Sequence, residues 1–120
     1  MGNILIVDDE PAIGNYLGMM ITRFGHQVEK TLTATDALAK LEAEAYQLII
    51  ADICLPDAPD AEAWICSLAQ KANGTPLVLI SGAPSAELTS CAKKHGVLAF
   101  LSKPFELAFI KNILKTVFET

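Results

Sequence analysis

The sequence predicts an α/β domain built on a five-stranded parallel sheet with helices on both faces. Five short apolar runs alternate along the chain with five segments whose apolar residues recur at helical spacing. Strands that alternate with helices pair in parallel, and their right-handed crossovers place helices on both faces of the sheet. With 120 residues, 52% of them hydrophobic, the chain can form one such core, so we expect a single domain over residues 1–120.

The first strand is expected over residues 3–7, a continuous apolar run rich in β-branched residues, as in strands buried on both faces. Pro11 suits the first turn of a helix, where the N–H that proline lacks has no partner. Apolar residues then recur at helical spacing as far as Phe24, and Gly25 stands where this helix would end.

The second strand and helix are more polar. A strand over residues 26–31 has Val28 as its only strongly apolar residue, and such polarity fits the edge of a sheet. Thr33 can cap a helix over residues 34–44, whose inner face carries leucines.

The third strand, over residues 47–51, is the most apolar segment up to that point, and it delivers Asp52 to the place where the chain must turn. A loop rich in proline and aspartate follows, before a helix that carries residues 61–68. Within this region we expect Asp57 to be a solvated turn residue. We expect Trp64 to pack at the interface of the helix that carries it rather than bind a ligand.

The last two strands are expected over residues 77–80 and 97–101. The last two helices are expected over residues 84–95 and 106–118. Gly96 stands where the first of these helices would end. Ser81 and Lys103 come shortly after the two strands, as Asp52 does after the third.

Polar residues therefore follow four of the five strands: Asp8, Asp9, Asp52, Ser81 and Lys103. In open α/β sheets ligands bind outside the carboxyl ends of the strands, so these side chains should share one rim. Clustered carboxylates suit Mg²⁺, and a carboxylate can attack phosphorus to form an acyl phosphate. A lysine and a hydroxyl would stabilise the phosphoryl oxygens, so the residues predict phosphoryl chemistry.

Four motifs at strand ends carry a family resemblance. In chain order they are Ile6-Val7-Asp8-Asp9-Glu10, Asp52-Ile53-Cys54-Leu55-Pro56, Ile80-Ser81-Gly82 and Phe100-Leu101-Ser102-Lys103-Pro104-Phe105. With them the chain resembles, over essentially its whole length, the receiver domain of two-component response regulators, of the chemotaxis-regulator type. The resemblance implies a flavodoxin-like three-layer sandwich, strand order 2-1-3-4-5 and a cis peptide bond before Pro104.

The resemblance also implies a role for each acid at the rim. Asp52 would be the phospho-acceptor, served by a sensor histidine kinase or a phosphotransfer protein. Asp8, Asp9, Asp52 and the backbone carbonyl of Cys54 would ligate Mg²⁺, and Lys103 would bind the phosphoryl group. The domain would be a signalling module rather than an enzyme, although it takes part in its own phosphorylation and dephosphorylation.

Ser81 would supply the hydroxyl of the conformational switch and Phe100 its aromatic ring, so that phosphorylation changes what an output domain or downstream protein contacts. Leu98 is a candidate partner contact on the face formed by the fourth helix, fifth strand and fifth helix. A homodimer through this face is a habit of the family.

Two other functions compete with this interpretation. The first is a Mg²⁺-dependent phosphatase that uses an aspartyl phosphate, but such enzymes place a second acid where this chain has Cys54. The second is a nucleotide- or flavin-binding module, for which neither GxGxxG nor GxxxxGK[ST] occurs in the sequence.

The composition of the chain argues against some classes of binding partner. A net charge of -5 argues against direct nucleic-acid binding by this domain, because phosphate backbones require basic surface. Three cysteines at unrelated spacings suit reduced thiols, and no apolar run approaches the length of a membrane span. We therefore expect a cytoplasmic location and no contact with a membrane.

Overall fold

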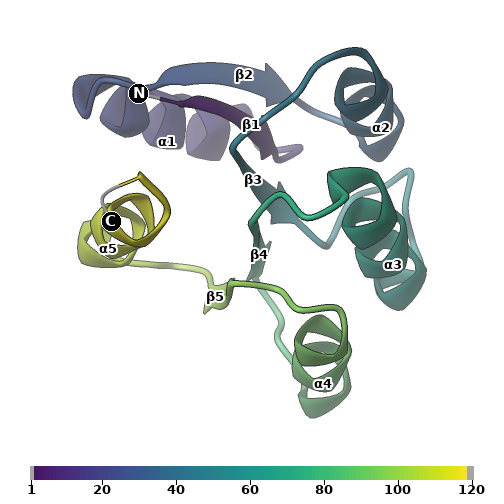
Figure 1. Ribbon diagram of the computed structural model, residues 1–120. Coiled ribbons are helices and arrows are strands. Elements are labelled where there is room, and N and C mark those ends of the chain that lie inside the picture. The colour runs from purple at the N-terminus through teal and green to yellow at the C-terminus, as the bar shows by residue number, and fades with distance from the viewer. Residues whose placement is uncertain (1, 119–120) are drawn as a thin grey trace.

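The computed structural model describes residues 2–118, and its five parallel strands pair in the order β2-β1-β3-β4-β5 (Figure 1). The strands are β1 (Asn3–Val7), β2 (Gln27–Thr31), β3 (Leu48–Asp52), β4 (Leu77–Ser81) and β5 (Ala99–Ser102). The helices are α1 (Pro11–Arg23), α2 (Ala34–Ala43), α3 (Ala61–Ala72), α4 (Ala86–Lys94) and α5 (Leu107–Phe118). The predicted fold class, the strand order and the cis bond between Lys103 and Pro104 are confirmed.

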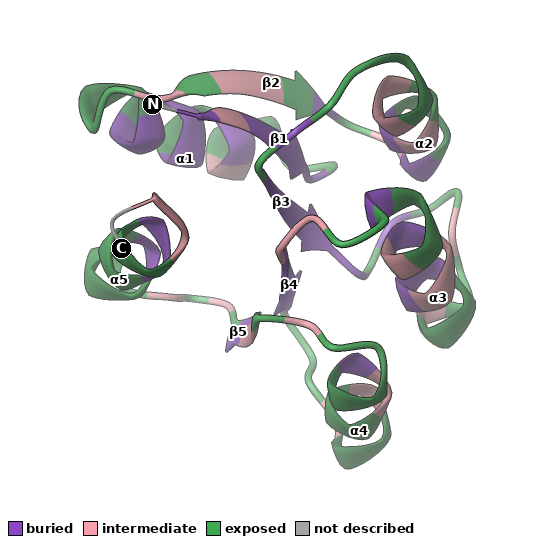
Figure 2. Ribbon diagram, in the orientation of Figure 1, coloured by how far each residue is buried: buried purple, intermediate pink, exposed green. Residues whose placement is uncertain are grey.

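Helices cover both faces of the sheet: α1 and α5 lie on one side, and α2, α3 and α4 on the other (Figure 1). Successive strand residues point to opposite faces, so β1 serves both layers. Ile4 and Ile6 belong to the cluster that includes residues of α1 and α5, whereas Leu5 and Val7 belong to the cluster on the α2–α4 side. Figure 2 shows the result, with buried central strands and helices buried only along their inner faces.

The strand β2 lies at the edge of the sheet, as its polarity predicted, and it is only partly buried. Gly18 of α1 packs on this strand: a Cβ at that position would lie 3.5 Å from the side chain of Lys30. None of the helices in the described part of the chain is long and apolar enough to cross a membrane.

The prediction was wrong about where α4 and β5 begin. The hydroxyl of Ser85 accepts a hydrogen bond from the backbone N–H of Leu88, which starts the helix at Ala86. At its other end Gly96 adopts a positive φ of 72°, and the N–H of Val97 returns to the carbonyl of Ala92. Val97 thus completes a helix cap and does not start a strand.

Candidate functional site

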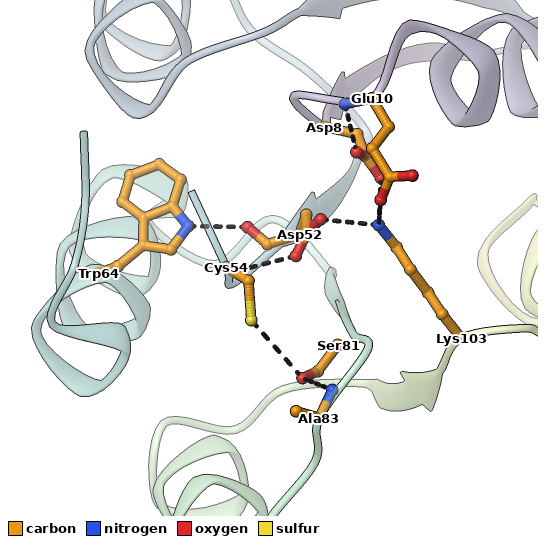
Figure 3. A network of polar contacts seen from close by, with 8 residues as sticks. All are labelled: Asp8, Glu10, Asp52, Cys54, Trp64, Ser81, Ala83 and Lys103. Atoms are coloured by element: carbon orange, nitrogen blue, oxygen red, sulfur yellow. Dashed lines mark hydrogen bonds and ion pairs between the residues drawn. The ribbon is translucent and has the colours of Figure 1, made fainter. Parts of the chain in front are cut away.

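The carboxyl ends of four strands meet at one rim of the sheet. Parallel pairing aligns Val7 with Ala51, Asp52 with Ile80, and Ser81 with Ser102. The residues that complete or follow these strands are thereby brought together, as the topology predicted. Figure 3 shows Asp8, Asp52 and Lys103 at this rim, with Ser81 nearby on the next strand.

Lys103 lies at the centre of the acidic part of the rim. Its Nζ atom is 2.8 Å from Asp52 Oδ2, 2.8 Å from Glu10 Oε1 and 3.1 Å from Asp8 Oδ2. The side chains of Asp8 and Asp52 are 1% and 3% exposed, whereas that of Glu10 is 60% exposed. One ammonium group therefore serves two buried carboxylates and one that faces solvent.

Burial and charge act in opposite directions at this cluster. Burial raises the pKa of the Asp8 carboxyl, although the N–H of Glu10 and the Lys103 ammonium favour its ionised form. Burial alone would lower the pKa of Lys103, but bonds to Asp52, Glu10 and Asp8 outweigh it, so this pKa is raised. Lys103 consequently stays positively charged at neutral pH.

Backbone N–H groups orient both buried carboxylates. Asp8 Oδ1 accepts a hydrogen bond of 2.9 Å from the N–H of Glu10, and Asp52 Oδ1 accepts one of 2.8 Å from the N–H of Cys54. Each aspartate is left with its Oδ2 atom facing Lys103.

The acidic side chains also suit a divalent cation. Carboxylate oxygens of Asp8, Asp9, Glu10 and Asp52 lie within 4.8 Å of one another. Asp8 Oδ2 is buried and accepts no aligned hydrogen bond, despite its ion pair with Lys103. A buried oxygen of this kind, beside other carboxylates, fits the ligand set of a hard cation such as Mg²⁺.

The backbone carbonyl of Asp52 accepts a hydrogen bond of 3.0 Å from the indole Nε1–H of Trp64 (Figure 3). Trp64 is 3% exposed and belongs to the core cluster on the α2–α4 side of the sheet, as we expected. Sequence reasoning missed its bond to Asp52. The indole therefore links α3 directly to the residue at the centre of the site.

Ser81 and Phe100 lie farther from the acids. Ser81 is fully buried, its Oγ atom accepts a bond of 3.0 Å from the N–H of Ala83, and Cys54 Sγ lies 3.9 Å away. Phe100 is partly buried and packs against the core cluster on the α2–α4 side. In the described structure neither side chain bonds to Asp52 or Lys103.

Asp57 is an exposed turn residue, as we expected, but its carboxylate also makes contacts that we did not predict. Its carboxylate accepts hydrogen bonds of 3.0 Å from the N–H of Ala34, the N–H of Thr35 and the hydroxyl of Thr35. The two backbone bonds lower the pKa of Asp57. The side chain is exposed, yet it joins the loop after β3 to the start of α2, from a position in the sequence that gives no local signal of this contact.

Comparison with known proteins agrees with the architecture and the motifs. The family model for the response regulator receiver domain matches residues 4–115. Response regulator ArlR of Staphylococcus aureus is 29% identical over 119 residues, which are 96% of this chain and 53% of that protein. The chain thus spans about half the length of the curated relatives that it matches.

Solved structures give the same result. A CheY-like response regulator receiver domain from Methanospirillum hungatei JF-1 superposes with a TM-score of 0.89 at 28% identity, covering 98% of this chain and 94% of that one. The beryllofluoride-activated NtrC4 receiver domain dimer has a TM-score of 0.87 at 26% identity, covering 98% and 96%. Because the family model matches nearly the whole chain, and the four motifs meet at one rim, this chain belongs to the response regulator receiver domain family of two-component signalling.

Proposed function

We propose that this domain accepts a phosphoryl group on Asp52 from the histidine of a sensor kinase or phosphotransfer protein. One observation carries the proposal: Asp52 Oδ2 is buried at the end of β3, beside an acidic cluster, and lies 2.8 Å from Lys103 Nζ. A carboxylate held next to a fixed ammonium can attack phosphorus while that ammonium binds the phosphoryl oxygens.

Mg²⁺ would be held by Asp8, Asp9, Asp52 and the backbone carbonyl of Cys54. When bound, the cation neutralises negative charge on the phosphoryl group and on the carboxylates. Asp52 Oδ2 forms the new bond to phosphorus, and the bond from phosphorus to the donor nitrogen breaks. Lys103 would exchange its contact with Asp52 Oδ2 for one with a phosphoryl oxygen. Catalysis would then come from positioning and charge rather than from proton transfer.

Phosphorylation of Asp52 would change the conformation of the domain through Ser81 and Phe100. The Ser81 hydroxyl lies on the strand next to Asp52, and Phe100 lies on β5, the strand that also leads to Lys103. Movement of the serine toward the phosphoryl group would free space that the ring of Phe100 can enter. The altered surface would then be recognised by an output domain or a downstream protein in the cytoplasm.

A homodimer through the face of α4, β5 and α5 is part of the proposal. Leu98, Leu107 and Phe109 expose 41%, 44% and 52% of their surface, which is apolar area that a second copy could cover. The NtrC4 relative is described as a receiver dimer. Sedimentation of the domain with and without beryllofluoride tests this, and a monomer in both samples would exclude it.

The phospho-acceptor is tested with acetyl phosphate and Mg²⁺. We expect intact-protein mass spectrometry to show the gain of one phosphoryl group, which is absent from Asp52→Asn and retained by Asp36→Asn, a matched change on the exposed side of α2. Labelling of Asp52→Asn to the wild-type level would contradict the proposal. Sustained release of phosphate from varied phosphoesters would instead indicate the phosphatase.

A further inference from the structure

The ammonium of Lys103 is crowded by carboxylates in this structure: it donates hydrogen bonds to Glu10 and Asp52 and lies in an ion pair with Asp8. An ammonium carries three N–H donors. Lys103 already contacts three carboxylates, those of Asp8, Glu10 and Asp52. A phosphoryl oxygen that binds Lys103 therefore competes with these carboxylates for the ammonium.

Asp8 and Asp52 are each held at the rim by a second bond. Both side chains are buried, and each is held by a backbone N–H on its Oδ1 atom. Rotation of either carboxylate would break that second bond within the core. The fold therefore keeps both carboxylates at the rim, also when Asp52 Oδ2 exchanges Lys103 for the phosphoryl group.

Glu10 is different in each of these respects. Its side chain is 60% exposed, and in the described residues its carboxylate has no partner other than Lys103. Glu10 is the N-cap residue of α1, but its side chain makes no capping hydrogen bond. Its carboxylate can swing into solvent while its backbone stays bonded to Asp8.

We propose that Glu10 is a displaceable counter-ion, which occupies Lys103 while Asp52 is unmodified and competes with the phosphoryl group for that ammonium. This inference rests on the proposed function. The exposed ion pair lowers the affinity of the site for a phosphoryl group, because the Glu10 carboxylate competes with that group for the same ammonium. It also adds a negative charge beside an anionic ligand.

Beryllofluoride, a stable analogue of a phosphoryl group on aspartate, tests the proposal in the intact domain at saturating Mg²⁺. Removal of an exposed ion pair should lower the beryllofluoride dissociation constant of Glu10→Gln by about two- to fivefold, as measured by ¹⁹F NMR titration. The urea midpoint of Glu10→Gln should stay near the wild-type value, which separates competition for Lys103 from a general change in folding.

Two variants control for ion pairing and for charge. Glu42→Gln breaks an exposed ion pair of the same kind, that with Lys71, between α2 and α3. Glu106→Gln removes a charge near Lys103 in the sequence, from a side chain with no bond or ion pair in the described structure. We expect neither to change the dissociation constant.

The outcomes separate the two proposals. If the wild-type domain does not bind beryllofluoride, the proposed function and the role of Glu10 both fail. If the wild-type domain binds it and Glu10→Gln binds equally or less tightly, only the role of Glu10 fails. An equal gain in Glu106→Gln would attribute the effect to net charge and would also overturn the competition at Lys103.

Discussion

Single hydrogen bonds fix the orientation of Asp52 in this domain. Its Oδ1 atom is held by the N–H of Cys54, its Oδ2 atom by Lys103, and its backbone carbonyl by the indole of Trp64. Two of these bonds hold the carboxylate and the third holds the backbone, so the residue has little freedom. If Asp52 is the phospho-acceptor that we propose, a carboxylate held in this way needs little further ordering before it reacts.

Trp64→Phe tests the bond to the backbone of Asp52. Phenylalanine keeps an aromatic ring in the core but cannot donate a hydrogen bond, so we expect a loss of about 1–3 kcal/mol in the free energy of unfolding. We also expect slower labelling by acetyl phosphate, because the backbone of Asp52 loses a support. Urea unfolding and mass spectrometry measure the two effects.

Ile65→Val is the matched control for Trp64→Phe, since Ile65 is buried in the same cluster and makes no polar contact through its side chain. It should cost about 0.5–1.5 kcal/mol and leave the labelling rate unchanged. Equal labelling rates in Trp64→Phe and the wild type would show that the indole serves packing alone.

At the scale of elements, α2 begins with two caps that come from different parts of the chain. Thr33 accepts a bond from the N–H of Asp36, and Asp57 accepts bonds from the N–H groups of Ala34 and Thr35. The first groups of a helix lack partners within it, so each acceptor stabilises this end. Because Asp57 belongs to the loop after β3, the same bonds tie α2 to the loop that follows Asp52.

Asp57→Asn should lower the urea midpoint at pH 7, and the difference from the wild type should depend on pH. The pKa of Asp57 is lowered in the folded protein, so its carboxylate stabilises the fold above the unfolded pKa of about 3.9. This contribution is lost as the pH falls through the folded pKa, because the protonated acid then resembles asparagine.

Urea unfolding of both proteins between pH 7 and pH 3 measures this dependence. Glu62→Gln is the control: Glu62 lies in the first turn of α3, and its side chain has no hydrogen bond or ion pair within residues 2–118. A difference between Asp57→Asn and the wild type that stays constant down to pH 3 would contradict the bonds to α2.

For the whole molecule, the architecture could be predicted from the sequence because the signals for each strand and helix are local. Each strand is a short apolar run and each helix has its own spacing, so the order of elements follows from the chain itself. The rim could be predicted as well, since Asp8, Asp52, Ser81 and Lys103 follow strands whose ends must meet. Strand order and the cis bond came from the family resemblance.

The contacts that could not be predicted from the sequence join residues that are distant in the chain and meet only in the folded structure. The bond from Asp57 to α2 and the pairing of Glu10 with Lys103 join residues far apart in the chain, 22 or more residues in each case. Val97 was misplaced because an apolar residue after a glycine fits a strand and a helix cap equally well. No pattern in the sequence separates these alternatives, since each is decided by packing.

The acidic rim also makes a prediction about the stability of the whole domain. Four acidic side chains crowd one edge of the sheet, and Lys103 is the cation that contacts Asp8, Glu10 and Asp52. A cation that binds the folded but not the unfolded chain stabilises it by an amount that grows with the logarithm of its concentration, about 2.7 kcal/mol at 100 times Kd. The melting temperature should therefore rise by several degrees with Mg²⁺ at constant ionic strength, and EDTA should reverse the rise.

Asp8→Asn distinguishes a specific site from general screening of charge. Without Mg²⁺ this variant should melt above the wild type, because a buried carboxylate whose Oδ2 atom lacks an aligned hydrogen bond becomes neutral. It should then gain little from Mg²⁺, whereas Asp36→Asn should respond as the wild type does. If Asp8→Asn and the wild type gain equally from Mg²⁺, the cation acts elsewhere on this acidic molecule and not between β1 and β3.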